Sequence, residues 1–433
     1  MGGLIMAGQL ILALTLLVVI HEFGHFIAAR MFGIKVTKFF IFFDAGFKIW
    51  SKKIGDTEFG FGWLPLGGYV KIAGMIDESM DTEQMKQEPK EWEFRSKPAW
   101  QRLIVMLAGV FMNIIAGILI LSFSHIVFTK EYLPVENVEQ GIYAYPYARY
   151  LGFETGDKII AIDGEKTHRY EDVFSSKLYF AKSIEVYRNG NIKEIAIPDT
   201  LYSYLKNGGL FISLDNYDFS IDSCVENMPI ADLNLKIGSK ILSINREKIK
   251  SFGQLREILN YNKNRELSFV FDNLGEIDSV NILIDSTGKL GIFTSPPVFK
   301  TANYNFFTAL LYGWKDAFEI VHSNIKGYGL IFSGKEKVKD NLQGPIGIAK
   351  VYGAVWDWSK FWRLTGIISM ILAFVNVLPI PALDGGHALF LVIEVITRRK
   401  LSDKFMGIVQ VIGMIILLAL MIFVIGNDII NLF

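Results

Sequence analysis

The chain alternates long apolar runs with polar stretches, and four runs are long enough to cross a membrane. The first is apolar from Leu4 to Ile20 and keeps a helical pattern to Arg30, and the second runs from Leu103 to Phe128. The third lies between Leu364 and Val395, and the fourth covers Met406 to Ile425. Because a spanning helix needs roughly 20 apolar residues, the pattern predicts a polytopic α-helical membrane protein with four spans.

The N-terminal run has a signal peptide as its competing interpretation. It lacks the basic residues that open a signal peptide, and no small-residue cleavage site follows it. The run is also longer than the usual apolar segment of such a peptide. We therefore interpret it as an uncleaved span.

The third run is interrupted by Pro379 and Pro381. Proline inside a span frees backbone groups that lipid cannot satisfy, so such breaks persist only where they line protein or a wet cavity. The broken span is therefore a candidate functional segment before any motif is considered.

Basic residues predict how the chain is oriented in the membrane. Lys and Arg gather in the segments 31–102 and 397–404, whereas the two ends of the chain carry none. Cytoplasmic loops are enriched in Lys and Arg, and long domains are translocated largely regardless of their charge. The two basic segments are therefore predicted to be cytoplasmic, and the termini and the insert 129–360 to lie outside.

The insert contains an internal repeat. Gly156–Asp163 reads Gly-Asp-Lys-Ile-Ile-Ala-Ile-Asp, and Gly238–Asn245 reads Gly-Ser-Lys-Ile-Leu-Ser-Ile-Asn. Each copy then continues into a helix-like stretch and into strands joined by a turn. The repeat resembles a pair of PDZ domains, whose signature is a glycine-acidic turn before an isoleucine-rich strand; Ser239 and Arg246 depart from that signature.

Two further stretches predict elements at the membrane surface. Phe59 to Met75 alternates and holds Gly67 and Gly68, which indicates a short hairpin or sheet near the membrane. Tyr304 to Ile331 is amphipathic and rich in aromatic residues, which suits a helix along the outer membrane face. An ordinary packed helix of the insert is the alternative for this stretch.

Composition narrows the possible chemistry. The 433 residues carry a formal net charge of +0, so nothing indicates a nucleic acid or another polyanion as partner. The single cysteine, Cys224, excludes an intrachain disulfide and a cysteine-rich metal site. Only six histidines are available for a metal site.

His21-Glu22-Phe23-Gly24-His25 forms an H-E-x-x-H motif at the end of the first span. Positions i and i+4 share one helix face, so both imidazoles can bind one Zn²⁺, with Glu22 beside them as general base. A chance occurrence is the alternative. Ionisable groups in a span are costly and usually functional, which favours the metal site.

A catalytic zinc takes three protein ligands and keeps an open position. The predicted orientation places His125 near the outer end of the second span, and His168 and His322 in the outer insert. The H-E-x-x-H motif ends the first span on the inner side. The third ligand is therefore sought in the third span, where the candidates are Asp384, His387 and Glu394.

Position along the third span ranks these candidates. Asp384 follows the proline break at a depth that suits His21, whereas Glu394 is roughly 15 Å further along a helix. His387 is one helical turn from Asp384 and stays a rival. We favour Asp384 over His387.

Asn376–His387 has the pattern N-x-x-P-x-P-x-L-D-G-G-H. Together with the H-E-x-x-H motif and the PDZ-like pair, it resembles the site-2 protease family of intramembrane zinc metalloproteases over nearly the whole chain. The resemblance implies that Asp384 is the third zinc ligand. It also implies that Asn376 binds substrate or stabilises the oxyanion as a catalytic residue. A helix–helix hydrogen bond is the alternative for Asn376.

Gly62 to Lys71 resembles the family's membrane-associated β-loop. The resemblance implies that this loop pairs with an extended substrate, because a helical substrate must unwind before its peptide bonds can be reached. The substrate-binding residues would be Gly67, Gly68, Tyr69 and Val70. A purely structural hairpin is the alternative. The family often has Gly-Pro in the second span, where this chain has Gly109-Val110.

The predicted organisation follows from these patterns and the resemblance. It comprises the first span with H-E-x-x-H at 1–33, the cytoplasmic or membrane-associated β-loop region at 34–98, the second span at 99–129, PDZ-like α+β domains at 130–212 and 213–300, an amphipathic interfacial segment at 301–360, the broken third span at 361–399 and the fourth span at 403–430.

The sequence thus predicts a zinc metalloendopeptidase that cleaves within membrane segments. The resemblance implies single-pass transmembrane substrates such as anti-sigma factors and remnant signal peptides, in regulated intramembrane proteolysis. It also implies a multi-pass protein of the bacterial inner membrane, in contact with lipid. The PDZ-like pair could bind exposed C-termini or filter substrates by size, and the resemblance favours the filter. The alternatives are a catalytically inert PDZ adaptor and a transporter with a broken helix. Nothing in the sequence predicts an oligomeric state.

Overall fold

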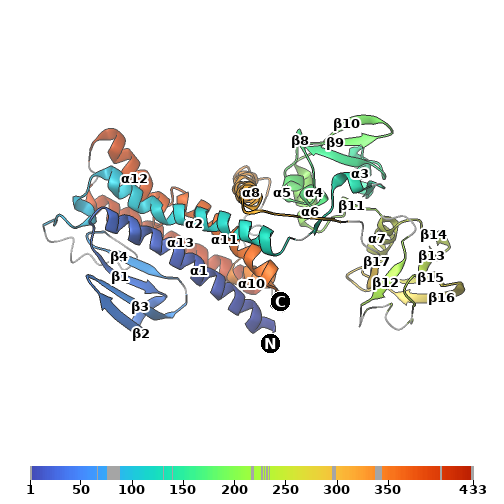
Figure 1. Ribbon diagram of the computed structural model, residues 1–433, viewed down its shortest axis with the longest axis horizontal. Helices are drawn as coiled ribbons and strands as arrows, with labels where there is room; N and C mark the ends of the chain where they lie inside the picture. Colours follow the sequence, from blue (N-terminus) through green and yellow to red (C-terminus); the bar gives the residue numbers. More distant parts are fainter. Residues whose placement is uncertain are drawn as a thin grey trace. The chain divides into compact units, whose positions relative to one another are not determined.

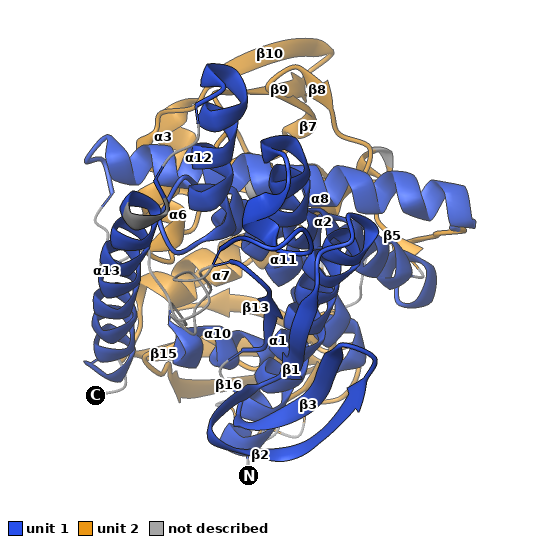
Figure 2. Cartoon of the chain, turned by 90° about the vertical axis from the view of Figure 1, so that its left-hand side faces the viewer, with its two compact units in different colours: residues 1–129, 304–433 blue, residues 130–303 orange. Residues whose placement is uncertain are grey.

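The computed structural model describes most of the chain. The described residues are 2–65, 67–75, 88–129, 131–138, 140–215, 219–225, 228, 230, 233, 235–294, 299–336, 344–399 and 402–430. The chain forms two compact units, shown in different colours in Figure 2. The first unit combines Met1–Thr129 with Tyr304–Phe433, and the second is Lys130–Asn303.

Four helices of the described chain are long and apolar enough to cross a membrane, which confirms the predicted number of spans. They are α1 (Gly2–Met31), α2 (Ala99–Val127), α11 (Trp358–Val377) and α13 (Asp403–Ile430). Lys97 and Pro98 precede α2, and proline at this position suits a helix start because the first backbone N–H groups have no intrahelical partner.

The third span is divided in two. α11 ends at Val377, and after the loop 378–383 the chain continues as α12 (Asp384–Thr397). Met370 of α11 packs against Gly117 of α2, whereas Leu391 of α12 packs in the same cluster as residues near the start of α2. The two pieces therefore run antiparallel to successive halves of α2, and the break lies inside one continuous path beside that helix (Figure 1).

Helix α8 (Phe306–Phe332) packs on the helices of the first unit. Gly313 faces Ser122 of α2 so closely that a Cβ would lie 2.2 Å from the serine Oγ. Tyr328 stacks on Phe374 of α11 with ring centroids 5.7 Å apart. Figure 1 shows α8 end-on where α2 runs across the picture, so the two helices cross steeply.

A short helix, α10 (Pro345–Tyr352), lies between α8 and α11 in the sequence and is tied to α13. The Asp428 carboxylate of α13 accepts hydrogen bonds from the backbone N–H groups of Gly344, Ile346 and Gly347 at 2.9–3.0 Å. These are N–H groups at the helix start, which need an acceptor outside the helix.

A four-stranded sheet follows α1. Its strands are β1 (Val36–Ile41), β2 (Phe43–Ile54), β3 (Thr57–Leu64) and β4 (Tyr69–Ile72), in the order β2-β3-β1-β4. β1 pairs parallel with β3 and antiparallel with β4. Of the two forms predicted for 59–75, the structure has the sheet: β3 and β4 lie on opposite sides of β1 and do not form a hairpin. The 3-10 helix η2 (Phe94–Ser96) then leads to α2.

The second unit contains two halves with the same topology. The first half has the sheet order β10-β9-β7-β8 and the pair β11-β6; the second has β14-β13-β15-β16 and the pair β12-β17. The first half comprises β6 (Ile142–Ala144), α3 (Pro146–Leu151), β7 (Lys158–Ile162), β8 (Glu165–Lys166), α4 (Tyr170–Val173), α5 (Ser176–Tyr179), β9 (Ser183–Arg188), β10 (Asn191–Ala196), α6 (Thr200–Lys206) and β11 (Ile212–Leu214). The second comprises β12 (Ile221–Cys224), β13 (Lys240–Ile244), β14 (Glu247–Lys248), α7 (Phe252–Tyr261), β15 (Glu266–Asn273), β16 (Glu276–Leu283) and β17 (Ile292–Thr294).

The sequence repeat has a structural counterpart in detail. Asp163 and Asn245 occupy equivalent positions after β7 and β13, and both have φ of 50°. The Asp163 side chain accepts from the backbone N–H of Ser183, and the Asn245 side chain accepts from that of Ser268. Short polar side chains tolerate this left-handed conformation best. The unit opens with β5 (Glu131–Tyr132) and η3 (Val135–Asn137), and β5 pairs with β18 (Lys300–Thr301).

Candidate active site

Helix α1 presents His21 and His25 one turn apart toward α2. Their rings meet edge to face, with centroids 4.8 Å apart. The two helices can approach closely because Gly24 faces the backbone of Ala108, where a Cβ would lie 2.5 Å from the carbonyl oxygen. A small residue at this crossing is therefore what lets the histidines contact α2.

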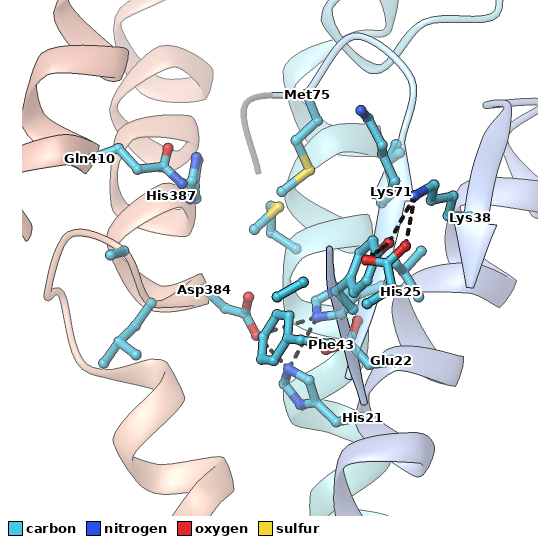
Figure 3. Close-up of a pocket in the computed structure, with 18 of the residues that line it drawn as sticks. His21, Glu22, His25, Lys38, Phe43, Lys71, Met75, Asp384, His387 and Gln410 are labelled. Carbon is cyan, nitrogen blue, oxygen red and sulfur yellow. Dashed lines mark hydrogen bonds and ion pairs between the residues drawn. The ribbon is translucent and has the colours of Figure 1, made fainter. Parts of the chain in front are cut away.

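Asp384, the first residue of α12, completes a cluster with the two histidines. Its Oδ2 lies 3.1 Å from His21 Nε2 and 3.4 Å from His25 Nε2. The two Nε2 atoms are 3.2 Å apart. Figure 3 shows the carboxylate pointing from its own helix toward both rings. This is the one group of potential metal ligands found among the described residues.

The three atoms have the spacing that a tetrahedral zinc ion requires. Bonds of about 2.0–2.1 Å at tetrahedral angles separate ligand atoms by about 3.3 Å. His25 Nδ1 contacts the Val105 carbonyl oxygen at 2.8 Å; a carbonyl only accepts, so Nδ1 carries the proton and Nε2 presents its lone pair. Asp384 Oδ2 is buried and lies against the two histidine nitrogens. A histidine lone pair and a carboxylate oxygen at this distance suit a cation held between them.

Glu22 lines the same cavity as the cluster but is not one of its three ligands. The cavity has a volume of about 420 Å³, with Phe43, Met75 and Met106 among its apolar lining and β4 along one side (Figure 3). A carboxylate beside the metal ligands, in a space large enough for a peptide segment, can act as general base.

Helix α2 supports both histidines through residues spaced by four. Val105 contributes the carbonyl that contacts His25, and Asn113 Nδ2 lies 3.2 Å from His21 Nδ1. Between them, Gly109 lies under both rings: a Cβ there would be 2.4 Å from His25 Nε2 and 2.7 Å from His21 Cε1. Sequence reasoning did not identify Gly109 or Asn113 as site residues. Their four-residue spacing, equal to that of the histidines, was the available signal.

The two other ligand candidates of the third span have other contacts. His387 lies beside Gln410 of α13, away from the histidine pair (Figure 3), and Gln410 is its side-chain hydrogen-bond partner. Glu394 forms a buried ion pair with Arg102 at the start of α2. The structure therefore brings Asp384, and neither of these residues, to the histidines.

Asn376 is not brought into the cavity. It is half-buried in the last turn of α11, and the loop 378–383 separates it from Asp384. It is not among the cavity-lining residues. Its predicted contact with substrate or oxyanion stays a prediction.

The predicted substrate-binding residues divide into two pairs. Tyr69 and Val70 belong to β4 and line the cavity, whereas Gly67 and Gly68 precede the strand and do not. At Gly68 a Cβ would lie 2.7 Å from the carbonyl oxygen of Phe40, so its backbone packs tightly on β1.

The Tyr69 side chain is held by neighbouring residues of the sheet. Its hydroxyl donates to Asp44 Oδ1 at 2.9 Å, and Lys38 Nζ donates to Asp44 Oδ2 at 3.0 Å. The ring is parallel to those of Phe40 and Phe43. Burial raises the pKa of the Asp44 carboxyl, but the hydrogen bonds from Lys38 and Tyr69 outweigh it and hold that pKa below its usual value. These contacts hold the Tyr69 side chain against the sheet.

Apolar helices that enclose an H-E-x-x-H pair and a carboxylate from a broken helix define a membrane-embedded metallopeptidase. A family comparison agrees: the model of peptidase family M50 matches residues 9–420. The chain belongs to peptidase family M50, which confirms the predicted site-2 protease family and makes it a zinc metalloendopeptidase.

Curated relatives extend over the whole chain. The chain is 30% identical to the regulator of sigma E protease of Haemophilus influenzae, over 98% of each chain. It is 28% identical to a putative zinc metalloprotease of Vibrio cholerae, over 96% of this chain and 97% of the relative. It is 26% identical to the probable protease eep of Enterococcus faecalis, over 97% of each.

Proposed function

We propose that this protein hydrolyses peptide bonds within transmembrane segments of single-pass membrane proteins. The observation that carries the proposal is the cluster of His21, His25 and Asp384, which α1 and α12 bring together beside α2. A protease whose site lies among spanning helices acts on substrates that reach the same depth.

His21, His25 and Asp384 would hold the zinc ion, and their donor spacing fits it. Bound there, zinc would polarise the scissile carbonyl and make a water molecule acidic enough to lose a proton near pH 7. Glu22 would accept a proton from the attacking water and deliver it to the nitrogen of the departing amine. Asn376 would bind substrate or assist the oxyanion.

β4 supports a mode of substrate binding. Among the described residues it lies at the edge of its sheet and pairs with β1 alone, while its residues line the cavity. An edge strand can add an extended peptide by backbone hydrogen bonds. A substrate helix unwound beside Tyr69 and Val70 would expose its peptide bonds to the metal site.

The relatives and the loop charges support a cellular context. One relative is named regulator of sigma E protease, which supports anti-sigma factors as substrates in regulated intramembrane proteolysis. Remnant signal peptides, which also cross the membrane once, are proposed as further substrates. Basic residues in 31–102 and 397–404 favour an inner-membrane protein with its active site toward the cytoplasm and the second unit outside. The two similar halves of that unit would be PDZ-like domains that filter substrates by size.

A comparison of Glu22→Gln with wild type tests the proposal. Both purified proteins are assayed for bound zinc and for cleavage of labelled single-span peptides, with Thr15→Val as control because Thr15 lies on α1 and bonds only its own helix. We expect zinc in all three and cleavage by wild type and Thr15→Val alone. Absence of cleavage by wild type across a panel of such peptides would contradict the proposal and favour the inert PDZ adaptor.

A further inference from the structure

A buried carboxamide contacts the nitrogen of His21 that faces away from the ligand cluster. Asn113 Nδ2 lies 3.2 Å from His21 Nδ1, and Asn113 is 1% exposed. Its backbone carbonyl accepts a hydrogen bond from Ser369 Oγ at 2.8 Å, which ties this turn of α2 to α11. The amide is therefore held next to the ring by two helices.

The two histidines differ in what contacts their Nδ1 atoms. His25 Nδ1 contacts a backbone carbonyl oxygen, which can only accept, so its proton stays on Nδ1. His21 Nδ1 contacts an amide, which can present either its oxygen or its NH₂ group after a half-turn of the side chain. The tautomer of His25 is thus fixed by the backbone, whereas that of His21 depends on which amide atom faces it.

The amide oxygen has no competing contact. Asn113 Oδ1 is buried and has no hydrogen-bond partner among the described residues. His21 can offer an Nε2 lone pair to a metal only if its proton is on Nδ1, and that proton then needs an acceptor. Asn113 Oδ1 is an acceptor that a half-turn brings to it.

We propose that Asn113 is a positioning residue that sets the tautomer of His21. With zinc held by the cluster, its Oδ1 accepts from His21 Nδ1–H. Without zinc, its Nδ2 donates to Nδ1, and the proton on Nε2 faces Asp384 Oδ2 at 3.1 Å. The inference rests on the proposed ligand set of His21, His25 and Asp384, and it assigns α2 a part in metal binding.

The test measures zinc affinity by chelator competition on the full-length protein, without any protease assay. Asn113→Leu keeps the size of the side chain and removes both functions of the amide, so we expect zinc affinity to fall about 10- to 100-fold. Asn113→Asp supplies acceptors alone and should bind zinc at least as tightly as wild type. Ser122→Ala is the matched control, because Ser122 is buried on α2 and its hydroxyl donates to Ile118 of the same helix.

The outcomes separate this inference from the ligand assignment. Wild-type affinity in Asn113→Leu, or a tenfold loss in Asn113→Asp, would overturn it. Thermal unfolding without zinc checks that each variant folds. If Asn113→Leu does not fold, the zinc affinity of Asn113→Asp still tests the inference. His25→Ala should abolish binding. Zinc retained in His25→Ala would mean that the proposed ligand set itself is wrong.

Discussion

At the residue scale, the site depends on two positions without a side chain as much as on the histidines and Asp384. Gly109 leaves room for both imidazole rings on the surface of α2, and Gly24 leaves room for the α2 backbone beside α1. Helix-interior glycine costs about 0.5–1 kcal/mol relative to alanine. At these two positions glycine permits a close contact between α1 and α2 that a larger residue would block.

Gly109→Ala should therefore impair metal binding. Its Cβ would lie 2.4 Å from His25 Nε2, so the His25 ring must move away from His21 and Asp384. We expect zinc affinity to fall at least tenfold, measured by chelator competition. Gly8→Ala, on the exposed side of α1 with nothing within 4 Å of its Cβ, is the control and should leave affinity unchanged. Equal affinity in both variants would show that the histidines do not need this contact.

The three residues of the cluster could be predicted from the sequence, but the residues of α2 that support them could not. His21, Glu22 and His25 are recognised by their spacing, and Asp384 by its place after the proline break. Asn113 is one polar residue in an apolar span, and many such residues only join helices. Its role depends on which face of α2 meets His21, which spacing within α2 alone does not determine.

At the scale of elements, α12 must hold Asp384 in place although a loop separates it from α11. Leu391 packs in a cluster with Val105 and Met106 of α2. At its far end, Glu394 pairs with Arg102, and their side chains are 12% and 6% exposed. α12 is thus attached to α2, the same helix that supports the histidines.

Breaking this ion pair should destabilise the protein, whereas removing both charges should not. Glu394→Leu leaves the Arg102 guanidinium buried without its partner, a loss of about 3–5 kcal/mol for buried pairs. We expect a lower unfolding temperature in detergent. The double variant Arg102→Met/Glu394→Leu should recover most of it, because two apolar residues can replace a buried pair. Zinc should stay bound in the double variant, and its loss there would reopen Glu394 as a ligand.

Pairing between elements was the least predictable part of the fold. Alternation in 59–75 correctly indicated β structure, but it left open whether neighbouring segments form a hairpin or belong to a larger sheet. β1 (Val36–Ile41) lies between the two strands instead, and its partners lie about 20 and 30 residues later in the chain. Periodicity locates strands but does not choose their neighbours, whereas the apolar spans need no partner to be recognised.

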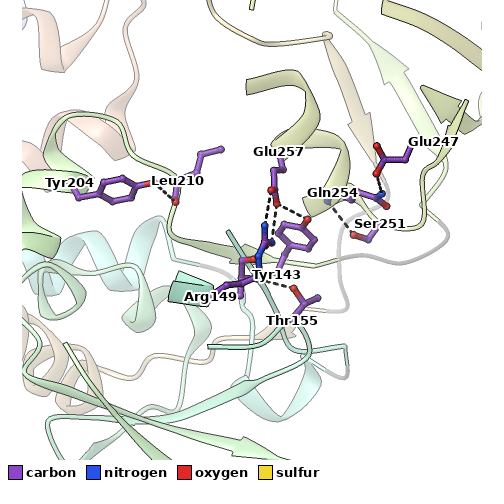
Figure 4. A network of polar contacts seen from close by, with 10 residues as sticks. Tyr143, Arg149, Thr155, Tyr204, Leu210, Glu247, Ser251, Gln254 and Glu257 are labelled. Atoms are coloured by element: carbon purple, nitrogen blue, oxygen red, sulfur yellow. Dashed lines mark hydrogen bonds and ion pairs between the residues drawn. The ribbon is translucent and has the colours of Figure 1, made fainter. Parts of the chain in front are cut away.

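At the scale of the whole molecule, side-chain contacts join the two halves of the second unit. Glu257 of α7 accepts hydrogen bonds from Tyr143 at 2.7 Å and from Arg149 at 2.8 Å, both in the first half (Figure 4). Burial, and then the Glu257 carboxylate, raise the pKa of the Tyr143 phenol well above its usual value. The Tyr143 ring also packs against Gly253, where a Cβ would lie 2.2 Å away. The proposed size filter would need such a fixed spacing.

Glu257→Ala should loosen the two halves of the second unit without unfolding either. Each half has its own apolar core, so the substitution weakens the contact between the halves and leaves the cores intact. Because the Arg149–Glu257 ion pair is partly exposed, we expect the contact to lose about 1 kcal/mol of stabilisation. Hydrogen exchange should accelerate several-fold in α7 and β6 and stay unchanged in β9 and β15. Glu165→Ala removes an exposed ion pair inside the first half and should change neither element. If α7 exchanges equally in both variants, the network does not couple the halves, and a filter would have to rely on another junction.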